Sequence, residues 1–509
     1  MTDDDAPYLR ALTRFAGREP GRLTVPGHKG GTAADGEQRL ALGPAAHALD
    51  VPTLIDGVDV VRGDDDVLDP LAHAEALAAR AWGATRTWFL TGGASQGNLA
   101  ACLAIAQGGA RRVVVQRTAH GSTIDGLIVA GLEPVFVAPE VDERLGIAHC
   151  VTPASLDRAL RDAPDAAAAF VVSPTYFGAV ADVAGLAAVA HVHGVPLIVD
   201  EAWGAHLPFG DGLPEAALAA GADLVVCSPH KHLGSLTGSA LLHLGRDVRG
   251  LDEERVARAL RLVSSTSPSS LLRASLDGAR RRAVCHGPAL LADMQRALTD
   301  LRARIAWIPG LRAVDGAALA AVPGVAGHDP LRLVVDVRDS GATGHAWGRL
   351  LRELADIEVE LCDEHVIVAV FGLGEDVAQT GARLLPALAR ARSRIAHRPR
   401  RGATSSPPRA TPRLVRTPRE AFLGAREPVA IADAVGRVAA EPVIPYPPGI
   451  PLVLPGEELD ALVLARCRAA ARSGVAIRGA SDPSLRTIVV LAEDEVAHHD
   501  PAAAAVALA

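Results

Sequence analysis

Two lysines are the residues of this sequence best suited to covalent chemistry. The chain has 51 basic residues, and Lys29 and Lys231 are its only lysines. A lysine amine can lose its proton and attack a carbonyl, whereas an arginine guanidinium cannot. Lys231 follows the apolar run ADLVVC within SPHKH, so a buried strand is expected to present it. The alternative is that both lysines are chance survivors of a bias that replaced surface lysines by arginines.

A carboxylate closes a second apolar run. Asp200 ends VPLIVD and precedes EAWGAH. An acid at the end of a buried strand is costly unless it is paired. A protonated ring nitrogen would satisfy it, and a plain helix cap is the alternative.

A glycine-rich turn could bind an anion. TGGASQGN, at residues 91–98, is expected to be a loop between a strand and a helix. Its backbone amides and the start of the following helix favour a phosphate, and Ser95 and Gln96 add side-chain donors. Such turns are common, so this motif alone has little weight.

Further polar residues complete a recognisable set. His120, after RRVVVQRTA, could stack on a flat ring or be an ordinary loop histidine, and Ser228 and His230 flank Lys231 with donors. Pyridoxal 5′-phosphate is a phosphorylated pyridine aldehyde. It matches this set of groups, namely an amine, an acid, an imidazole and an anion-binding turn.

Alternating helices and strands must position these residues. Residues 71–82 have helical spacing. Strand-like apolar runs are expected at residues 87–90, 111–116, 134–139, 166–176, 195–202 and 222–231. Continuous apolar strands separated by helices predict an α/β fold with a doubly wound, mostly parallel sheet, which binds ligands at the carboxyl ends of its strands.

Changes in composition predict five segments. They are an N-terminal segment (1–60), a large cofactor-binding domain (61–300), a small α/β domain (301–395), a Pro- and Arg-rich linker (396–420) and a C-terminal domain (421–509). The linker could also be a basic tail for nucleic acid, but its Pro and Ser content favours a solvated connection.

Composition argues against several classes of function. With 509 residues, of which 49% are apolar, the chain can bury a large core. The net charge of −8 and 3% aromatic content argue against nucleic-acid binding. No apolar run approaches the ~20 residues of a membrane helix, and the acidic N-terminus lacks a signal core. The six cysteines form no CxxC pair. We therefore expect a cytoplasmic protein without a metal site.

Eight motifs follow one another along nearly the whole chain. They are TVPGHKGG, TGGASQGN, RTAHGS, SPTYFG, VDEAWGAH, SPHKHLGSLTGS, STSPSSLLRASLDGAR and YPPGIPLVLPGE. In this order they resemble the signatures of the Orn/Lys/Arg decarboxylase family, and most closely its shorter bacterial arginine or lysine decarboxylase-like branch. The resemblance implies a fold-type-I pyridoxal-phosphate enzyme, with a large doubly wound domain and smaller C-terminal α/β domains.

The resemblance also implies roles for single residues. Lys231 matches the Schiff-base lysine, Asp200 the partner of the pyridinium nitrogen and His120 the stacking histidine, and His230 joins them as a catalytic residue. Further cofactor contacts are implied for Ala94, Ser95, Gln96, Ala202, Ser228 and His230.

Other implied residues concern assembly and substrate. In the family the active site lies at a dimer interface, and the STSPS block reaches the phosphate in the partner subunit. Here that would be Ser265 or Thr266, so a homodimer or a higher homo-oligomer is expected. Glu360, in IEVELCDE, matches a glutamate near the distal cation of a basic substrate, and its alternative is a solvated strand edge.

Several residues depart from the family pattern. Those that differ from a common family residue are Thr24, Ala94, Trp203, Gly238 and Ser270. They bear on substrate identity more than on cofactor chemistry. Lys29 has no buried strand before it, so we expect it to be structural or to face a partner.

The leading hypothesis is decarboxylation of arginine, lysine or ornithine to CO₂ and a di- or polyamine. Loss of CO₂ requires the carboxylate to face a poorly hydrated wall, to which Trp203 could contribute, although it could equally be a core residue. A second hypothesis is another reaction of the same cofactor, such as transamination or elimination. A third is a non-catalytic relative that binds the cofactor or a polyamine.

Overall fold

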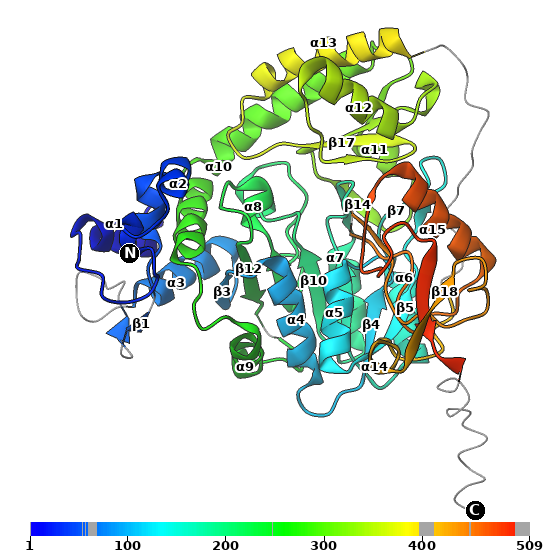
Figure 1. Cartoon of the computed structure of the whole chain (residues 1–509), viewed down its shortest axis with the longest axis horizontal. Coiled ribbons are helices and arrows are strands. Elements are labelled where there is room, and N and C mark those ends of the chain that lie inside the picture. The colour runs from blue at the N-terminus through cyan, green and yellow to red at the C-terminus, as the bar shows by residue number, and fades with distance from the viewer. Residues whose placement is uncertain are drawn as a thin grey trace, which may run out of the picture.

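A large central unit carries the predicted site residues. The computed structural model describes residues 2–52, 54–55, 58–59, 69–246, 248–395, 412–446 and 449–493. In Figure 1 a smaller α/β unit lies above the large one, helices α1 and α2 lie at its left edge, and the C-terminal unit lies at its right. The central sheet is thus bordered by the smaller α/β unit, by helices α1 and α2, and by the C-terminal unit.

The central sheet has seven strands in the order β3-β12-β11-β10-β8-β4-β5. The strands are β3 (Arg86–Leu90), β4 (Arg112–Gln116), β5 (Glu133–Val137), β8 (Ala166–Val172), β10 (Leu197–Glu201), β11 (Leu224–Cys227) and β12 (Ala240–Leu244). Strands β5, β4, β8, β10 and β11 are parallel neighbours, whereas β12 is antiparallel to both β11 and β3. The sheet is therefore mixed and mostly parallel, as the sequence predicts.

Helices cover both faces of this sheet. Helices α4 (Gly93–Ala106), α5 (Gly121–Ala130) and α9 (Glu253–Val263) pack on one face, and α6 (Pro153–Asp162) and α7 (Val183–Val192) on the other. Neighbouring strand residues such as Val113 and Val114 are both buried because they enter opposite layers. Burial on two sides explains why these strands are continuous apolar runs.

Two predicted boundaries near the site can now be compared with the structure. Helix α3 (Pro70–Trp82) matches the helix predicted at 71–82, with the Asp69 side chain capping its start. The loop expected at 91–98 is wrong, because α4 already begins at Gly93. The Gln96 carboxamide oxygen accepts the Gly92 backbone N–H at 2.9 Å, which closes the first turn early.

A long helix connects the large unit to the small one. Helix α10 (Ser270–Ile305) runs through residue 300, where the sequence places a domain boundary. The small sheet has the order β13-β15-β17-β16, and all its neighbouring strands are antiparallel. Its elements are β13 (Arg312–Val314), β15 (Arg332–Asp336), α12 (Gly344–Ala355), β16 (Leu361–Cys362), β17 (Val366–Val370) and α13 (Val377–Arg394).

Short elements complete this part of the chain. They are β6 (Val141–Asp142), β7 (Ile147–Ala148), β9 (Ala179–Ala181), η2 (Leu207–Phe209), α8 (Pro229–His232), α11 (Gly316–Leu319), β14 (Val325–His328) and η3 (Arg338–Ser340). Strand β14 pairs with β9, which ties the small unit to the loop that follows β8.

The C-terminal unit packs around its own apolar core and is anchored to the large unit. It contains α14 (Pro418–Leu423), β18 (Arg426–Ala430), β19 (Ile444–Tyr446), α15 (Ala461–Ser473), β20 (Ala476–Arg478) and β21 (Thr487–Leu491). The buried guanidinium of Arg117, just after β4, binds both oxygens of Glu457 at 2.9 Å. Such a bidentate pair fixes orientation as well as distance.

The N-terminal segment packs against α3 and α10. It contains α1 (Pro7–Gly17), η1 (Lys29–Gly31), α2 (Gly36–Leu49), β1 (Leu54–Ile55) and β2 (Val58–Asp59). The predicted boundary at residue 60 and most of the predicted linker, residues 396–411, lie outside the described residues. Among the helices that are described, none combines the length and apolar character needed to cross a bilayer.

Candidate active site

The end of β11 presents Lys231. Cys227 ends the strand, and the short helix α8 follows after Ser228. Lys231 Nζ lies 3.7 Å from the centroid of the Trp203 ring. Burial lowers the pKa of Lys231 from 10.5 to about 8, an effect that Asp200 opposes and Arg332 reinforces. The amine is therefore much easier to deprotonate than an ordinary lysine, as a nucleophile requires.

Asp200 lies at the end of the neighbouring strand β10, in register with Val226 of β11. Its carboxylate is buried and accepts two hydrogen bonds: Oδ1 from the Ala202 backbone N–H at 3.1 Å, and Oδ2 from Asn98 Nδ2 at 3.0 Å. Asn98 is fully buried on α4 and also donates to Ser122 Oγ at 3.0 Å. These contacts fix the position of the carboxylate.

His120 lies beside this network at the start of α5. Its Nδ1 accepts the Ser122 backbone N–H at 3.2 Å and so caps the helix. Burial lowers the pKa of His120, against the opposing effect of Asp200, so the ring favours its neutral form. Gly449 of the C-terminal unit lies against the ring: a Cβ on that glycine would be 2.9 Å from His120 Nε2. The C-terminal unit thus closes one side of the site.

The predicted anion-binding turn lies at the start of α4 and contacts Ser264 and Gly238. Ser95 is exposed, Ala94 is half-buried, and Gln96 Nε2 donates to Ser264 Oγ at 2.8 Å. In the same turn, the Gly93 backbone N–H donates to the Gly238 carbonyl at 2.7 Å. Gly238, a departure from the family pattern, has φ +88°, a conformation that suits glycine.

His230 and Ser228, which precede Lys231, differ in their hydrogen bonding. His230 Nδ1 donates to the Ser239 carbonyl at 2.6 Å, and burial lowers the pKa of this histidine. Ser228 is fully buried, and its hydroxyl has no hydrogen-bond partner within the described residues. A buried hydroxyl is normally paired, so this atom is suited to contact a ligand.

The residues fit pyridoxal phosphate chemically. Lys231 offers an amine of lowered pKa for the aldehyde, and Asp200 offers an acceptor for the ring nitrogen. Ser228 offers an unpaired donor, and the start of α4 favours an anion. Ala202, whose backbone N–H binds Asp200, has a small and buried side chain.

A second group of residues reaches toward Glu360. The Tyr176 hydroxyl, in the loop after β8, donates to Glu360 Oε1 at 2.5 Å. The Tyr176 ring packs edge-on to Trp203, with ring centroids 5.1 Å apart. Burial and the Glu360 charge raise the pKa of Tyr176 well above its usual range, so it stays a hydrogen-bond donor. Glu360 is exposed and lines a hollow together with Glu358 and Glu375.

The structure adds a residue that the sequence analysis missed. Arg332, the first residue of β15, is fully buried, and its guanidinium carbon lies 3.4 Å from the Trp203 ring centroid. No sequence signal distinguishes it among the 49 arginines, which make up all but two of the 51 basic residues. Only the packing of the small unit on the large one brings it here.

A buried histidine–aspartate cluster lies next to this group. His206 Nε2 and Asp329 Oδ1 are 3.0 Å apart, and His232 Nε2 lies 3.9 Å from Asp329 Oδ2. The ligand atoms of the three residues lie within 4.8 Å of one another, close enough to share one metal ion. The sequence analysis expected no such cluster. His232 directly follows Lys231 in α8, and its ring centroid lies 5.9 Å from that of Trp203.

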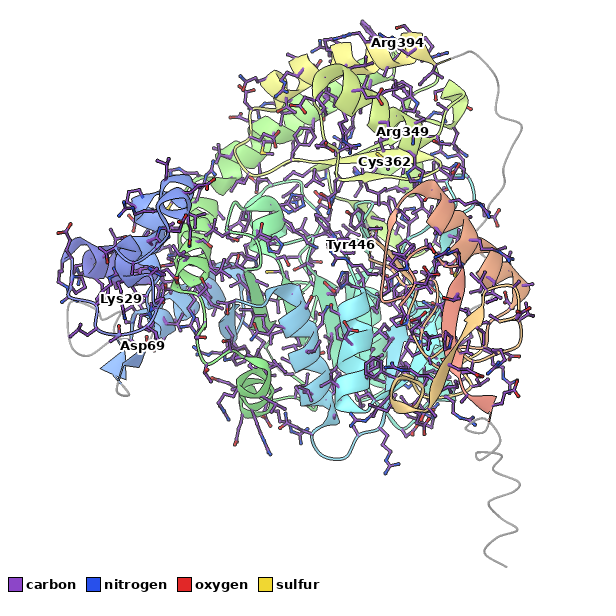
Figure 2. The ribbon with its side chains drawn as sticks, in the orientation of Figure 1. Lys29, Asp69, Arg349, Cys362, Arg394 and Tyr446 are labelled. Carbon is purple, nitrogen blue, oxygen red and sulfur yellow. The ribbon has the colours of Figure 1, made fainter. Side chains whose placement is uncertain are left out.

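Several predicted residues lie away from Lys231 or have structural contacts. Ser265 and Thr266 are exposed just before α10. Ser270 is buried and joins α10 to the N-terminal segment, donating to the Leu49 carbonyl at 2.9 Å. The Lys29 amine donates to the Thr24 carbonyl within its own loop. Figure 2 shows Lys29 at the α1–α2 edge of the molecule, whereas Tyr446 lies near the centre, below the strand that carries Cys362.

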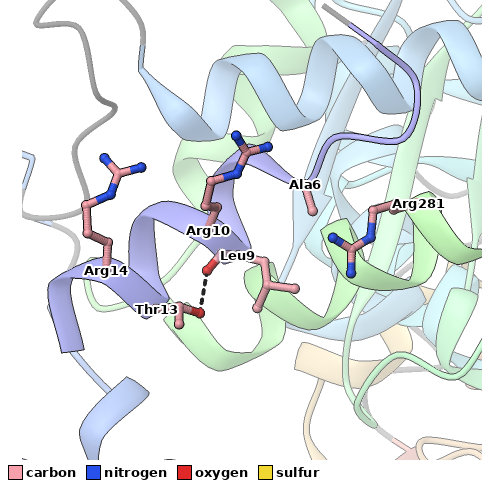
Figure 3. A pocket seen from close by; sticks show the side chains of 6 residues that line it. All are labelled: Ala6, Leu9, Arg10, Thr13, Arg14 and Arg281. Atoms are coloured by element: carbon pink, nitrogen blue, oxygen red, sulfur yellow. Dashed lines mark hydrogen bonds between the residues drawn. The ribbon is translucent and has the colours of Figure 1, made fainter. Parts of the chain in front are cut away.

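A separate hollow lies between α1 and α10. Figure 3 shows that Arg10, Arg14 and Arg281 line it with Thr13, whose hydroxyl donates to the Leu9 carbonyl at 2.8 Å. None of the predicted site residues lines this hollow. It is distinct from the site around Lys231.

The mixed α/β sheet, with a lysine and an aspartate at neighbouring strand ends, defines the class of fold-type-I pyridoxal-phosphate enzymes. Among solved structures, the constitutive lysine decarboxylase of E. coli superposes with a TM-score of 0.78 at 21% identity, covering 96% of this chain and 82% of that chain. Lysine decarboxylase A from Pseudomonas aeruginosa gives 0.78 at 20% identity, covering 96% and 80%.

Sequence comparison identifies the family. The model described as Orn/Lys/Arg decarboxylase, major domain, matches residues 6–322, and that of the C-terminal domain matches residues 403–470. The chain is 34% identical over 496 residues to an arginine decarboxylase of Bacillus subtilis (strain 168), covering 97% of this chain and 99% of that protein. An arginine decarboxylase of Halalkalibacterium halodurans is 33% identical over 500 residues, covering 97% and 99%. The chain belongs to the Orn/Lys/Arg decarboxylase family and is an amino-acid decarboxylase, as its motifs predict.

Proposed function

We propose that this chain uses pyridoxal phosphate to decarboxylate a basic amino acid, arginine before lysine or ornithine, releasing CO₂ and the corresponding amine. The observation that carries the proposal is the continuous set of contacts from Lys231 through Trp203 and Tyr176 to Glu360. It provides an amine for the cofactor at one end and a carboxylate for a substrate cation at the other. Arginine is favoured because the relatives matched over 97% of the chain are arginine decarboxylases.

Several residues would hold the cofactor. Lys231 would bind its aldehyde, His120 and Ala202 would lie against its ring, and Asp200 would accept a hydrogen bond from its protonated ring nitrogen. Ser228 and the start of α4, where Ala94, Ser95 and Gln96 lie, would hold its phosphate. When bound, this cofactor accepts the electron pair left as the bond between Cα and the carboxylate breaks.

The protein's own groups prepare that reaction. Asn98 and the Ala202 N–H donate to the Asp200 carboxylate and fix its orientation, so that it would accept a hydrogen bond from the protonated ring nitrogen. The neutral His120 ring provides a flat surface without repelling that nitrogen. The half-buried Trp203 excludes water on the substrate side. After CO₂ leaves, Lys231 and His230 are the nearby groups that can return a proton to Cα.

Glu360 supplies recognition at the far end. A substrate cation entering a partly buried site without a counter-ion is costly, and the Glu360 carboxylate removes that cost. The Tyr176 hydroxyl fixes the position of one carboxylate oxygen, which leaves the other for the substrate. Glu375 lines the same hollow, whereas the Glu358 carboxylate there is paired with Arg352 at 2.5 Å.

Assembly, domain boundaries and compartment are part of the proposal. The exposed Ser265 and Thr266 would contact the phosphate in the partner of a homodimer with shared active sites. We retain the division into segments 1–60, 61–300, 301–395, 396–420 and 421–509, and a cytoplasmic location. The separate apolar core between Ile431 and Val490 supports an independent C-terminal domain.

A substrate panel tests the reaction. Purified protein, loaded with pyridoxal phosphate, is supplied with carboxyl-labelled arginine, lysine and ornithine, and released CO₂ and product mass are measured. We expect labelled CO₂ with arginine in the largest yield. Transfer of the amino group to a keto acid without CO₂ release would overturn the reaction. A bound cofactor with no turnover of any amino acid would instead favour the non-catalytic alternative.

A further inference from the structure

Arg332 is a buried cation whose polar atoms are unsatisfied. The residue is fully buried, and Nε, Nη1 and Nη2 all lack a hydrogen-bond partner within the described residues. Burial lowers the pKa of Arg332 only to about 10, so it remains positively charged at neutral pH. A buried guanidinium normally binds an anion, frequently through two parallel hydrogen bonds. Its unpaired N–H groups therefore point to a ligand.

The surrounding structure holds this side chain in place. The Arg332 backbone carbonyl accepts a hydrogen bond from Arg302 Nη2 at 2.8 Å. Gly178 makes room for the stem, because a Cβ at that position would lie 2.8 Å from Arg332 Cβ and Cγ. The guanidinium lies on Trp203 at 3.4 Å and near the Tyr176 ring at 5.7 Å. The backbone, the aliphatic part and the guanidinium of Arg332 are thus each positioned by a separate contact.

Two cations converge on one indole ring. Lys231 Nζ and the Arg332 guanidinium lie within 3.7 Å of the Trp203 ring centroid, and the Arg332 charge helps to lower the pKa of Lys231. The charges of Asp329 and Glu360 act on Arg332, and that of Asp200 acts on Lys231, but among the described residues no acid forms an ion pair with Arg332 within 4.0 Å. The N–H groups of Arg332 therefore remain available to bind a carboxylate beside Trp203.

We propose that Arg332 binds the α-carboxylate of the substrate. The inference rests on the proposed function, since a basic amino acid carries three charged groups. Its α-amine goes to the position of Lys231, and its distal cation goes to Glu360. The remaining group, the carboxylate, meets the unpaired guanidinium beside Trp203.

This assignment has a consequence for the product. The amine that remains after CO₂ loss has no carboxylate, so it loses the contact with Arg332 and keeps the one with Glu360. Arg332 therefore raises affinity for substrate over product and favours product release. Because the departing carboxylate gives up this contact as CO₂ leaves, removal of Arg332 should raise KM without lowering kcat.

The test compares substrate with product amine on the holoenzyme. The variants are Arg332→Gln, Arg332→Lys, which keeps the buried charge, and the control Arg349→Gln, at an exposed arginine on α12. Arginine affinity is measured from KM and from rapid-mixing titration of the cofactor's visible absorbance. Affinity for the decarboxylated amine is measured from the equilibrium absorbance change, and thermal denaturation monitors folding.

We expect Arg332→Gln to weaken arginine binding about 100-fold and Arg332→Lys about 10-fold, with amine affinity within about threefold of wild type. Equal losses for arginine and amine, or no loss in a folded Arg332→Lys protein, would overturn the assignment. Wild-type protein that binds no basic amino acid would overturn the proposed function as well. Binding without CO₂ release would overturn only the reaction.

Discussion

The two ends of the site are built in different ways. At the Lys231 end, buried residues on neighbouring strands and helices form one hydrogen-bonded network in which Asn98 links Asp200 to Ser122. At the Glu360 end, an exposed carboxylate is held by one tyrosine hydroxyl, and the buried Arg332 is the first residue of β15, where it pairs with Val370 of β17. The first end is buried and hydrogen-bonded, which suits chemistry. The second is assembled from distant segments and reaches an exposed carboxylate, which suits recognition and release.

The largest effect is expected at the chemical end. Lys231→Ala should abolish the visible absorbance of bound pyridoxal phosphate and reduce activity roughly 10⁴- to 10⁶-fold, since it removes the covalent attachment. The chain offers a matched control, because Lys29→Ala removes the only other lysine. Absorbance that persists in Lys231→Ala and disappears in Lys29→Ala would reverse the assignment of the two lysines.

The next effect concerns the charge that Asn98 and Ala202 stabilise. Asp200→Asn keeps the size of the side chain but removes the negative charge that opposes the ring nitrogen. We expect kcat to fall roughly 100- to 1,000-fold while the cofactor still binds. Steady-state kinetics and cofactor titration measure the two quantities separately. Loss of binding with unchanged kcat per bound cofactor would mean that Asp200 has only a structural role.

A pH profile tests the dry environment of Lys231 directly. With a pKa of about 8, the deprotonated fraction of its amine rises from about 1% at pH 6 to about 90% at pH 9. The rate at which apoprotein forms the visible cofactor band should therefore rise about 100-fold over this range and level off above pH 8. Because Asp200 raises this pKa, Asp200→Asn should move the midpoint to lower pH. A rise that continues to pH 10 would indicate a solvated amine.

The smallest effect is expected at the recognition end. Glu360→Gln should raise KM for arginine roughly 10-fold with little change in kcat, because the carboxylate is exposed and contributes mainly to binding. Glu358→Gln is the control: it lines the same hollow but is paired with Arg352 at 2.5 Å. A similar KM for both variants would mean that Glu360 does not contact the substrate cation.

The same contrast explains what the sequence could predict. Lys231, Asp200 and His120 stand at the ends of apolar strands, so their place at one edge of a parallel sheet follows from local pattern. Asn98 belongs to a motif that was recognised, but its bond to Asp200 depends on the packing of α4 against β10. Arg332 reaches Trp203 only through contact between two units, and nothing in a single arginine-rich sequence distinguishes it. Strand β12 was not predicted either; it is antiparallel to both of its neighbours, so the alternation of parallel strands and helices does not indicate it.

The pair between Arg117 and Glu457 joins residues that are 340 positions apart in the sequence. The C-terminal unit that carries this carboxylate also brings Gly449 against His120. A chain truncated before this unit would therefore lack both the acid that neutralises a buried guanidinium and the contact that closes one side of the site.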